Sequence, residues 1–170
     1  ISPAGARGLM QVRPGTAQDM ARARGASFAA SQLDRPAVNL EYGQSYLEKL
    51  RDLPATGGLL PKVIAAYNAG PVPLARWNSE IRDNGDPLLF IESIPYRETR
   101  HYIENVLRNL WMYELRDGHS PASMDAIAAG LWPRLPGFGG ELAVKRDPLP
   151  IRPRPEPGSF TPEAWPSDDR

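Results

Sequence analysis

The sequence predicts a mainly α-helical domain followed by a Pro-rich, disordered C-terminal tail. Two observations support this prediction. Apolar residues recur at three- and four-residue spacings between residues 38 and 115, and no Val/Ile/Thr-rich stretch alternates with a period of two. Beyond about residue 141 prolines dominate, and apolar residues are too sparse to offset the entropy of ordering the chain. We therefore do not expect strands to contribute to the core.

Turn residues delimit the first two predicted helices. Pro14-Gly15 forms a turn that leads into a helix over about residues 16–24, which Gly25 ends. A second helix is expected from about residue 38 to Leu53, because its apolar residues have helical spacing and the residue before a proline disfavours the helical conformation. These apolar residues are Val38, Leu40, Tyr42, Tyr46, Leu47 and Leu50.

Two further helices begin with proline at their first turn. Pro61 starts a helix that runs through Tyr67 and ends at the Asn-Ala-Gly-Pro of residues 68–71. Pro95 starts the longest predicted helix, which continues to Leu115. Its apolar residues repeat on one face, so we expect it to be the central buried helix. They are Tyr102, Ile103, Val106, Leu107, Leu110, Trp111 and Leu115.

The C-terminal third is expected to change from a docked segment to a tail. A short helix over residues 120–130 has a cap residue, a proline and a terminal glycine, and Trp132 and Phe138 would fix it to the domain. We divide the chain into three parts. The main helical domain covers residues 1–118, a short helix and docking segment covers 119–140, and a Pro-rich disordered tail covers 141–170. A solvated end is the simpler interpretation of this tail, and a peptide that docks on a protein partner is the alternative.

Composition limits the classes of function. A length of 170 residues suits one domain plus a tail. Twenty Lys and Arg balance twenty Asp and Glu, so we expect no binding to nucleic acid or to an anionic membrane. No apolar run approaches the roughly twenty residues of a membrane-spanning helix. Cys is absent, and His101 and His119 are too isolated to form a metal site.

The first motif covers residues 2–11, Ser-Pro-Ala-Gly-Ala-Arg-Gly-Leu-Met-Gln. Gly5 and Gly8 allow positive φ or a close backbone approach, and the simplest interpretation is a tight loop that enters a helix with its apolar residues in the core. Alternatively, exposed backbone beside Gly8, the adaptable Met10 side chain and the Gln11 amide would suit an N-acetylated sugar. Such a ligand offers a methyl group to bury and an amide to hydrogen-bond.

The second motif, Ala-Ala-Tyr-Asn-Ala-Gly at residues 65–70, has an equally good structural explanation. A helix that ends in Asn-Ala-Gly-Pro shows ordinary C-terminal capping, and Tyr67 would be a core aromatic residue. The third motif, at residues 94–102, places Glu98 in the first turn of a helix. There the helix dipole and the neighbouring Arg97 and Arg100 stabilise a carboxylate, which also explains it without a function.

The three motifs, in this order, resemble the catalytic domain of the soluble lytic transglycosylases, lysozyme-like enzymes that cut the glycan strands of bacterial peptidoglycan. The resemblance covers about residues 1–116 and implies a helical fold of the goose-type lysozyme and lytic transglycosylase kind. It also implies that the Tyr67 hydroxyl supports catalysis by pointing toward the acid/base and the glycan. The substrate-binding residues implied by the resemblance are Ser2, Gly8, Met10, Gln11, Tyr67, Asn68, Ala69, Glu98 and Tyr102.

The resemblance further implies a mechanism with a single carboxylate and no cofactor. A Glu with a raised pKa protonates the leaving oxygen, the sugar's acetamido group stabilises the cationic centre, and the same Glu then takes the proton of the C6 hydroxyl of N-acetylmuramic acid, which closes a 1,6-anhydro ring. In the family this Glu precedes the segment that begins at Ser2, so we expect it upstream of Ile1 and expect residues 1–170 alone to be inactive. Glu98 is not expected to replace it, because Arg97 and Arg100 favour its ionised form.

Three alternatives remain open at this point. The first is a hydrolytic lysozyme or chitinase on the same scaffold, and the second is a peptidoglycan-binding module without catalysis. The third is a helical adaptor that recruits a partner through the Pro-rich tail. The resemblance to the lytic transglycosylases implies peptidoglycan glycan strands as the partner and the periplasm or cell envelope as the location.

Overall fold

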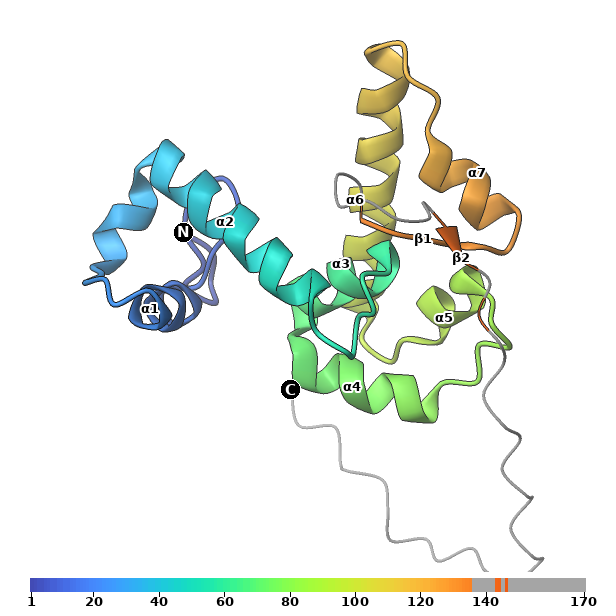
Figure 1. Ribbon diagram of the computed structural model, residues 1–170, viewed down its shortest axis with the longest axis horizontal. Helices are drawn as coiled ribbons and strands as arrows, with labels where there is room; N and C mark the ends of the chain where they lie inside the picture. The colour runs from blue at the N-terminus through green and yellow to red at the C-terminus, as the bar shows by residue number, and fades with distance from the viewer. Residues whose placement is uncertain (136–142, 145, 147–170) are drawn as a thin grey trace, which may run out of the picture.

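The computed structural model describes residues 1–135, 143–144 and 146, and in this part the chain is mainly helical, as predicted (Figure 1). Phe138 and most of the predicted tail lie outside the described residues. None of the helices in the described ranges is both long and apolar enough to cross a membrane. In chain order the elements are α1 Pro14–Ala23, the 3₁₀ helix η1 Ala30–Asp34, α2 Pro36–Arg51, α3 Leu60–Ala69, α4 Pro71–Glu80, α5 Pro87–Ser93, α6 Arg97–Arg116, α7 Ala122–Ala128, β1 Trp132–Pro133 and β2 Ala143–Val144.

The five predicted helices correspond to α1, α2, α3, α6 and α7, whereas no element was predicted in the region of α4 and α5. Pro71 at the first position of α4 loses no hydrogen bond there, so a proline expected to end a helix instead begins the next one. In α5 the Asp86 carboxylate caps the helix by accepting from the backbone N–H of Leu88 and Leu89 at 2.7 and 2.9 Å.

The central buried helix is α3, not α6 as the apolar spacing predicted. Every residue from Leu60 to Ala66 is buried, whereas α6 fully buries only Thr99, Ile103 and Leu107 among its residues. The far end of α6 extends beyond the body of the molecule, with α7 beside it (Figure 1). Leu115, which the pattern placed in the core, is therefore 57% exposed.

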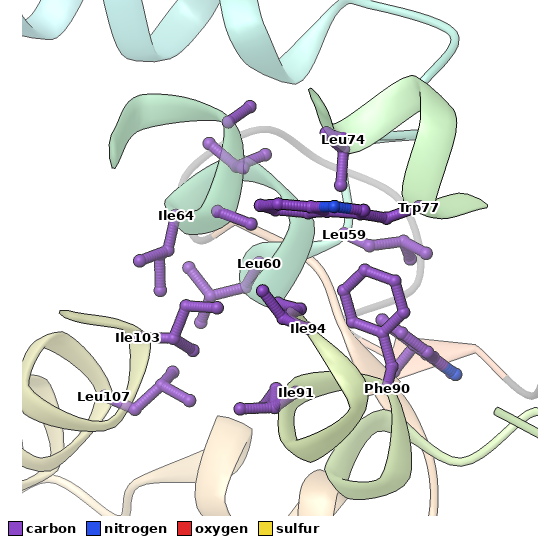
Figure 2. Close-up of a cluster of buried hydrophobic side chains, with 14 of the residues drawn as sticks. Leu59, Leu60, Ile64, Leu74, Trp77, Phe90, Ile91, Ile94, Ile103 and Leu107 are labelled. Atoms are coloured by element: carbon purple, nitrogen blue, oxygen red, sulfur yellow. The ribbon is translucent and has the colours of Figure 1, made fainter. Parts of the chain in front are cut away.

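Two hydrophobic cores divide the structure into two lobes. The larger core packs α3 against α4, α5 and α6, and Figure 2 shows its side chains around Trp77, which is fully buried. The smaller core contains Val12, Ala17 and Leu33. Figure 1 shows α1, η1 and the start of α2 set apart from the other helices, with α2 running from one lobe to the other. The segment before α1 lines a cavity together with residues of α3 and α6.

The C-terminal part of the described chain packs on the larger lobe. Trp132 is fully buried, as expected of an anchoring residue, and its indole N–H donates to the Gly85 carbonyl oxygen at 2.7 Å. β1 pairs with β2 in antiparallel fashion, and Arg146 Nη1 lies 3.2 Å from Asp83 Oδ2. Contact with the domain therefore reaches residue 146, within the segment assigned from composition to the tail.

Candidate functional site

A tight loop over residues 2–12 forms one wall of a cleft. Arg7 and Val12 exchange backbone hydrogen bonds of 3.0 Å, and the Ser2 hydroxyl accepts from the backbone N–H of Ala6 at 3.0 Å. Gln11 adopts a φ of 50°, which a non-glycine residue rarely does, and its side-chain amide donates to the Gly8 carbonyl oxygen at 2.8 Å. The loop thus has a fixed shape, with backbone strain at the position that faces the cleft.

The buried amide of Asn39 in α2 holds this loop in place. Its Oδ1 accepts from the Met10 backbone N–H at 2.7 Å, and its Nδ2 donates to the carbonyl oxygens of Arg7 and Leu33 at 2.7 and 3.0 Å. Gly8 has a φ of 71°, and a Cβ atom there would lie 2.2 Å from Asn39 Nδ2. Gly8 is therefore required by packing and by backbone conformation together.

Tyr67 joins the loop to the opposite lobe. It lies near the end of α3, and its hydroxyl donates to the Met10 carbonyl oxygen at 2.7 Å. Its ring packs against Tyr46 of α2, with 5.4 Å between ring centroids. Burial raises the pKa of Tyr67, so the hydroxyl stays protonated and remains a donor at physiological pH.

A polar pair from α3 and α6 forms the next part of the wall. Thr99, which is buried, donates through its hydroxyl to Asn68 Oδ1 at 2.7 Å. This bond fixes the orientation of the Asn68 amide, and its Nδ2 lies 3.5 Å from Glu98 Oε1. Gly70, with a φ of 95°, ends α3 directly behind this pair. Glu98 itself is exposed in the first turn of α6.

Three adjoining cavities lie between these walls. The outer cavity, of about 320 Å³, is lined by Ser2, Ala4, Ala6, Gln11, Arg13, Tyr67, Asn68, Glu98 and Tyr102. The inner cavity, of about 120 Å³, is lined by Gln11, Val12, Arg13, Thr16, Tyr46, Tyr67, Asn68, Ala69 and Gly70. The apolar pocket, of about 330 Å³, is lined by Leu9, Met10, Gln11, Leu47, Ile64, Tyr67, Tyr102 and Val106. All three share Gln11 and Tyr67, so they adjoin at these two side chains, and we refer to them together as the cleft.

The cleft brings together the residues that the motifs singled out, with one difference. Ser2, Gln11, Tyr67, Asn68, Glu98 and Tyr102 line the outer cavity, Met10 lines the apolar pocket and Ala69 lines the inner cavity. Gly8 lines none of the three, because it supports the loop from behind. Sequence reasoning did not identify Arg13, Thr16 and Tyr46, which also face the cleft.

Arg13 and Tyr46 differ in how much signal the sequence offered. Arg13 lies two residues after the first motif, so its charge and its position beside the motif could have indicated a residue of the site. Tyr46 was assigned only to an apolar helix face, and its place at the cleft depends on the packing of α2 against α3.

A larger cavity, of about 550 Å³, lies elsewhere, between the end of α2 and the chain after β1. It is lined by Arg51, Asp52, Leu53, Pro54, Gly57, Gly58, Arg134 and Leu135, none of which belongs to a motif. We therefore place the candidate site at the three-part cleft. The described residues contain no group of three or more His, Cys, Asp and Glu suited to hold a metal ion.

The chemistry of the cleft differs from one end to the other. The outer and inner cavities offer amide, phenol, hydroxyl and charged groups, which suit a polar ligand such as a sugar or a peptide. The apolar pocket has no carboxylate among its lining residues, although burial there raises the pKa of Tyr102. Glu98, the carboxylate of the outer cavity, is exposed and accepts from the Asn68 amide.

A helical scaffold that brings three motif segments to one cleft is the arrangement that the motifs led us to expect of the lytic transglycosylase catalytic domain. Residues 1–90 match the transglycosylase SLT domain family, and the chain therefore belongs to that family. The resemblance stated from the motifs is thus confirmed.

Particular relatives agree with this assignment. The chain is 38% identical over 132 residues to the soluble lytic murein transglycosylase of Escherichia coli K12, which covers 76% of this chain and 20% of the relative. It is 38% identical over 112 residues to the protein of the same name from Salmonella typhimurium, covering 62% of this chain and 16% of the relative. The chain thus spans about a fifth or less of the length of these relatives.

Solved structures show the same fold. The crystal structure of the 70 kDa soluble lytic transglycosylase of E. coli superposes with a TM-score of 0.67 at 36% identity, over 78% of this chain and 21% of that one. A second structure is that of an inactive mutant of the lytic transglycosylase Slt from Pseudomonas aeruginosa, in which one glutamate is replaced by glutamine. It superposes with a TM-score of 0.62 at 36% identity, over 70% of this chain and 19% of that one. The predicted lysozyme-like helical fold class is confirmed.

Proposed function

We propose that this chain supplies the substrate cleft of a peptidoglycan lytic transglycosylase. The reaction is cleavage of the β-1,4 bond between N-acetylmuramic acid and N-acetylglucosamine with formation of a 1,6-anhydro-muramoyl product. The observation that carries the proposal is the meeting of all three motif segments at one cleft, whose outer cavity and apolar pocket share Gln11, Tyr67 and Tyr102.

The side chains of the cleft divide into two proposed roles. Ser2, Gln11, Asn68 and Glu98 bind the polar edges of the sugars, while Met10, Ala69 and Tyr102 contact their apolar faces. Tyr67 keeps the Met10 backbone at its place in the cleft through the 2.7 Å hydrogen bond to the carbonyl oxygen. Its protonated hydroxyl makes it a positioning group and excludes it as a base.

The proton donor is proposed to come from a segment outside residues 1–170. A carboxyl group serves as an acid near neutral pH when an apolar environment raises its pKa, and the apolar pocket beside Tyr67 offers that environment without supplying the carboxyl group. In the P. aeruginosa relative a single glutamate-to-glutamine change accompanies inactivity. A glutamate placed against the apolar pocket would reach the glycan in the outer cavity, and residues 1–170 alone would bind without cutting.

This proposal places the protein where its substrate is, in the periplasm or cell envelope. The acetamido group of the substrate would stabilise the cationic centre, so no second carboxylate is required of the chain, in contrast to ordinary glycosidases. A cleft that binds peptidoglycan without any catalysis is the second candidate. It is favoured by the same observation, that the apolar pocket lacks a carboxylate.

Cosedimentation of the 170-residue chain with purified, insoluble peptidoglycan sacculi tests the cleft. We expect binding that Asn68→Ala and Glu98→Ala each weaken about fivefold, since each removes one hydrogen-bonding group worth about 1 kcal/mol. Asn105→Ala, an exposed substitution on α6 away from the cleft, is the matched control and should bind like the native chain. A folded chain that stays in the supernatant would refute both candidate functions.

A further inference from the structure

Arg13 is a charged residue of the cleft to which no role has been given. It occupies the N-cap position of α1 without a side-chain capping bond, and it lines both the outer and the inner cavity, together with Gln11, Tyr67 and Asn68. Its side chain is exposed and forms no ion pair or hydrogen bond with any described residue. An arginine that faces a cavity and has no partner in the protein is available to a ligand.

The distribution of charge along the cleft shows which kind of ligand group Arg13 would meet. Arg13 is the only charged residue among those that line the inner cavity, so an anion entering it meets no opposing carboxylate there. Glu98 also lines the outer cavity, but it forms no ion pair with Arg13 and instead accepts from Asn68. The two charges therefore mark separate positions along one cleft.

The other groups of the inner cavity suit a peptide-like or carboxylated arm rather than another sugar ring. The cavity holds about 120 Å³, too little for a further disaccharide unit, and it presents the Thr16 hydroxyl and the Gln11 and Asn68 amides. A ligand whose sugar occupies the outer cavity could extend a side arm past Arg13. In peptidoglycan the lactyl ether of N-acetylmuramic acid is such an arm, and it ends in a carboxylate or continues into a peptide that carries carboxylates.

We infer that Arg13 selects muramic acid by binding a carboxylate on its lactyl side arm. This inference deepens the proposed function and rests on it, because it assumes that the glycan lies in the outer cavity. The guanidinium offers two parallel N–H donors that match a carboxylate, and the neighbouring amides satisfy the rest of the arm. A polymer of N-acetylglucosamine alone has no such carboxylate, so the contact would distinguish peptidoglycan from chitin.

Titration of the 170-residue chain by isothermal calorimetry or NMR tests this assignment with three soluble probes. The first is the disaccharide of N-acetylglucosamine and N-acetylmuramic acid with a free lactyl carboxylate. The second is the same disaccharide carrying L-Ala-D-isoglutamate, and the third is the neutral tetramer of N-acetylglucosamine. Arg13→Gln should weaken binding of a carboxylated probe about threefold to fivefold, as expected of a solvent-exposed ion pair, and leave the neutral tetramer unchanged.

Two controls separate a carboxylate contact from a structural effect. Arg22→Gln removes the same charge from the same helix at an exposed position that lines none of the three cavities, and it should bind all probes like the native chain. The loss in Arg13→Gln should shrink at 1 M salt and be partly restored by Arg13→Lys, which keeps the charge. A loss confined to the first probe assigns the contact to the free lactyl carboxylate, and a loss confined to the dipeptide probe, in which that carboxyl group is an amide, assigns it to a peptide carboxylate. A loss with both probes shows that Arg13 binds whichever carboxylate ends the arm.

The remaining outcomes overturn the inference. Equal binding of the carboxylated probes by Arg13→Gln and the native chain would show that Arg13 does not contact a carboxylate. An equal loss for all three probes would show that it acts through the structure of the cleft. Failure of the native chain to bind any probe would refute the proposed function together with the inference, whereas binding of the tetramer with no charge effect would refute the inference alone.

Discussion

Gly8 shows how one residue of the first motif combines two constraints. Its φ of 71° lies where side chains rarely fit, and a Cβ atom would come 2.2 Å from Asn39 Nδ2. Gly5 in the same loop has a φ of 77° but nothing within 4 Å of its Cβ position. The two glycines therefore separate the effect of backbone conformation from the effect of close packing.

Replacing each of these glycines by alanine should give different losses of stability. We expect Gly5→Ala to lower the free energy of unfolding by about 1 kcal/mol, the usual cost of a left-handed conformation. Gly8→Ala should lower it by roughly 3 kcal/mol, because the new methyl group also displaces the Asn39 amide and its hydrogen bonds. Urea denaturation of the two variants measures the difference. Equal losses would contradict the packing role of Gly8.

Individual contacts of the site lay partly beyond sequence reasoning. The motifs indicated Met10, Tyr67 and Asn68, since their residue types and order are specific. The residues that hold them in place, Asn39 and Thr99, are ordinary helix positions in the sequence, and they become recognisable only when chain segments about 30 residues apart are brought together, as in the bond from Met10 N–H to Asn39 across 29 residues. Local pattern carries no information on such pairs.

At the scale of elements, start and stop signals predicted helices better than apolar spacing predicted their burial. Asp86-Pro87 is a capping signal that was available in the sequence, and α5 begins there. The strong apolar face of α6 indicated a central helix, but α3 occupies the centre. Burial depends on which helices cover a face, and the spacing along one helix does not contain that information.

A buried lysine links α3 to the C-terminal anchor. Lys62 is 3% exposed, its Nζ donates to Asn78 Oδ1 at 2.5 Å, and it lies 4.8 Å from the ring centroid of Phe90 and 5.1 Å from that of Trp132. The two rings favour the charged form of the amine. Burial outweighs them and lowers the pKa of Lys62 to about 8, from 10.5.

The free energy of unfolding should therefore rise with pH between about 8 and 10.5, because Lys62 loses its proton earlier in the folded chain than in the unfolded chain. In this range the unfolded chain keeps the proton that the folded chain has lost, so raising the pH favours the folded state, by roughly 3 kcal/mol over the full range. The measurement is the difference in unfolding free energy between the native chain and Lys62→Met from pH 7 to 10. The tyrosines also have raised pKa values, but they are present in both chains, so their contribution to the pH dependence cancels in this difference.

At pH 7 we expect Lys62→Met to have the larger free energy of unfolding. As the pH rises, the free energy of unfolding of the native chain should increase relative to that of the variant. Lys49→Met, at an exposed position of α2, is the control and should show a flat difference. A flat difference for Lys62→Met as well would show that the buried amine does not lose its proton in this range.

At the scale of the molecule, the described residues form two lobes, and the cleft lies where the lobes meet. The loop of residues 2–12 is fixed to the smaller lobe by Asn39, and Tyr67 of the larger lobe closes on it through the Met10 carbonyl oxygen. The order of α1, α2, α3, α6 and α7 was predictable from the sequence, whereas α4 and α5 were missed. The division into two cores was not predictable, because it depends on α2 running from one to the other (Figure 1).

We propose that this cleft serves lytic transglycosylation and that its proton donor comes from a segment outside residues 1–170. Mass spectrometry of the soluble products from purified sacculi tests it most directly. One sample contains the 170-residue chain, and a second contains a chimera that adds the segment preceding the matched region of the E. coli relative. A third contains the same chimera with each glutamate of that segment changed to glutamine.

We expect muropeptides lighter by one water than hydrolysed ones from the chimera, and no such products from the chain alone or from the glutamine variant. Muropeptides that have gained water would instead indicate a hydrolase. Anhydro products from the 170-residue chain alone would contradict the account, since they would show that an acid within these residues is sufficient.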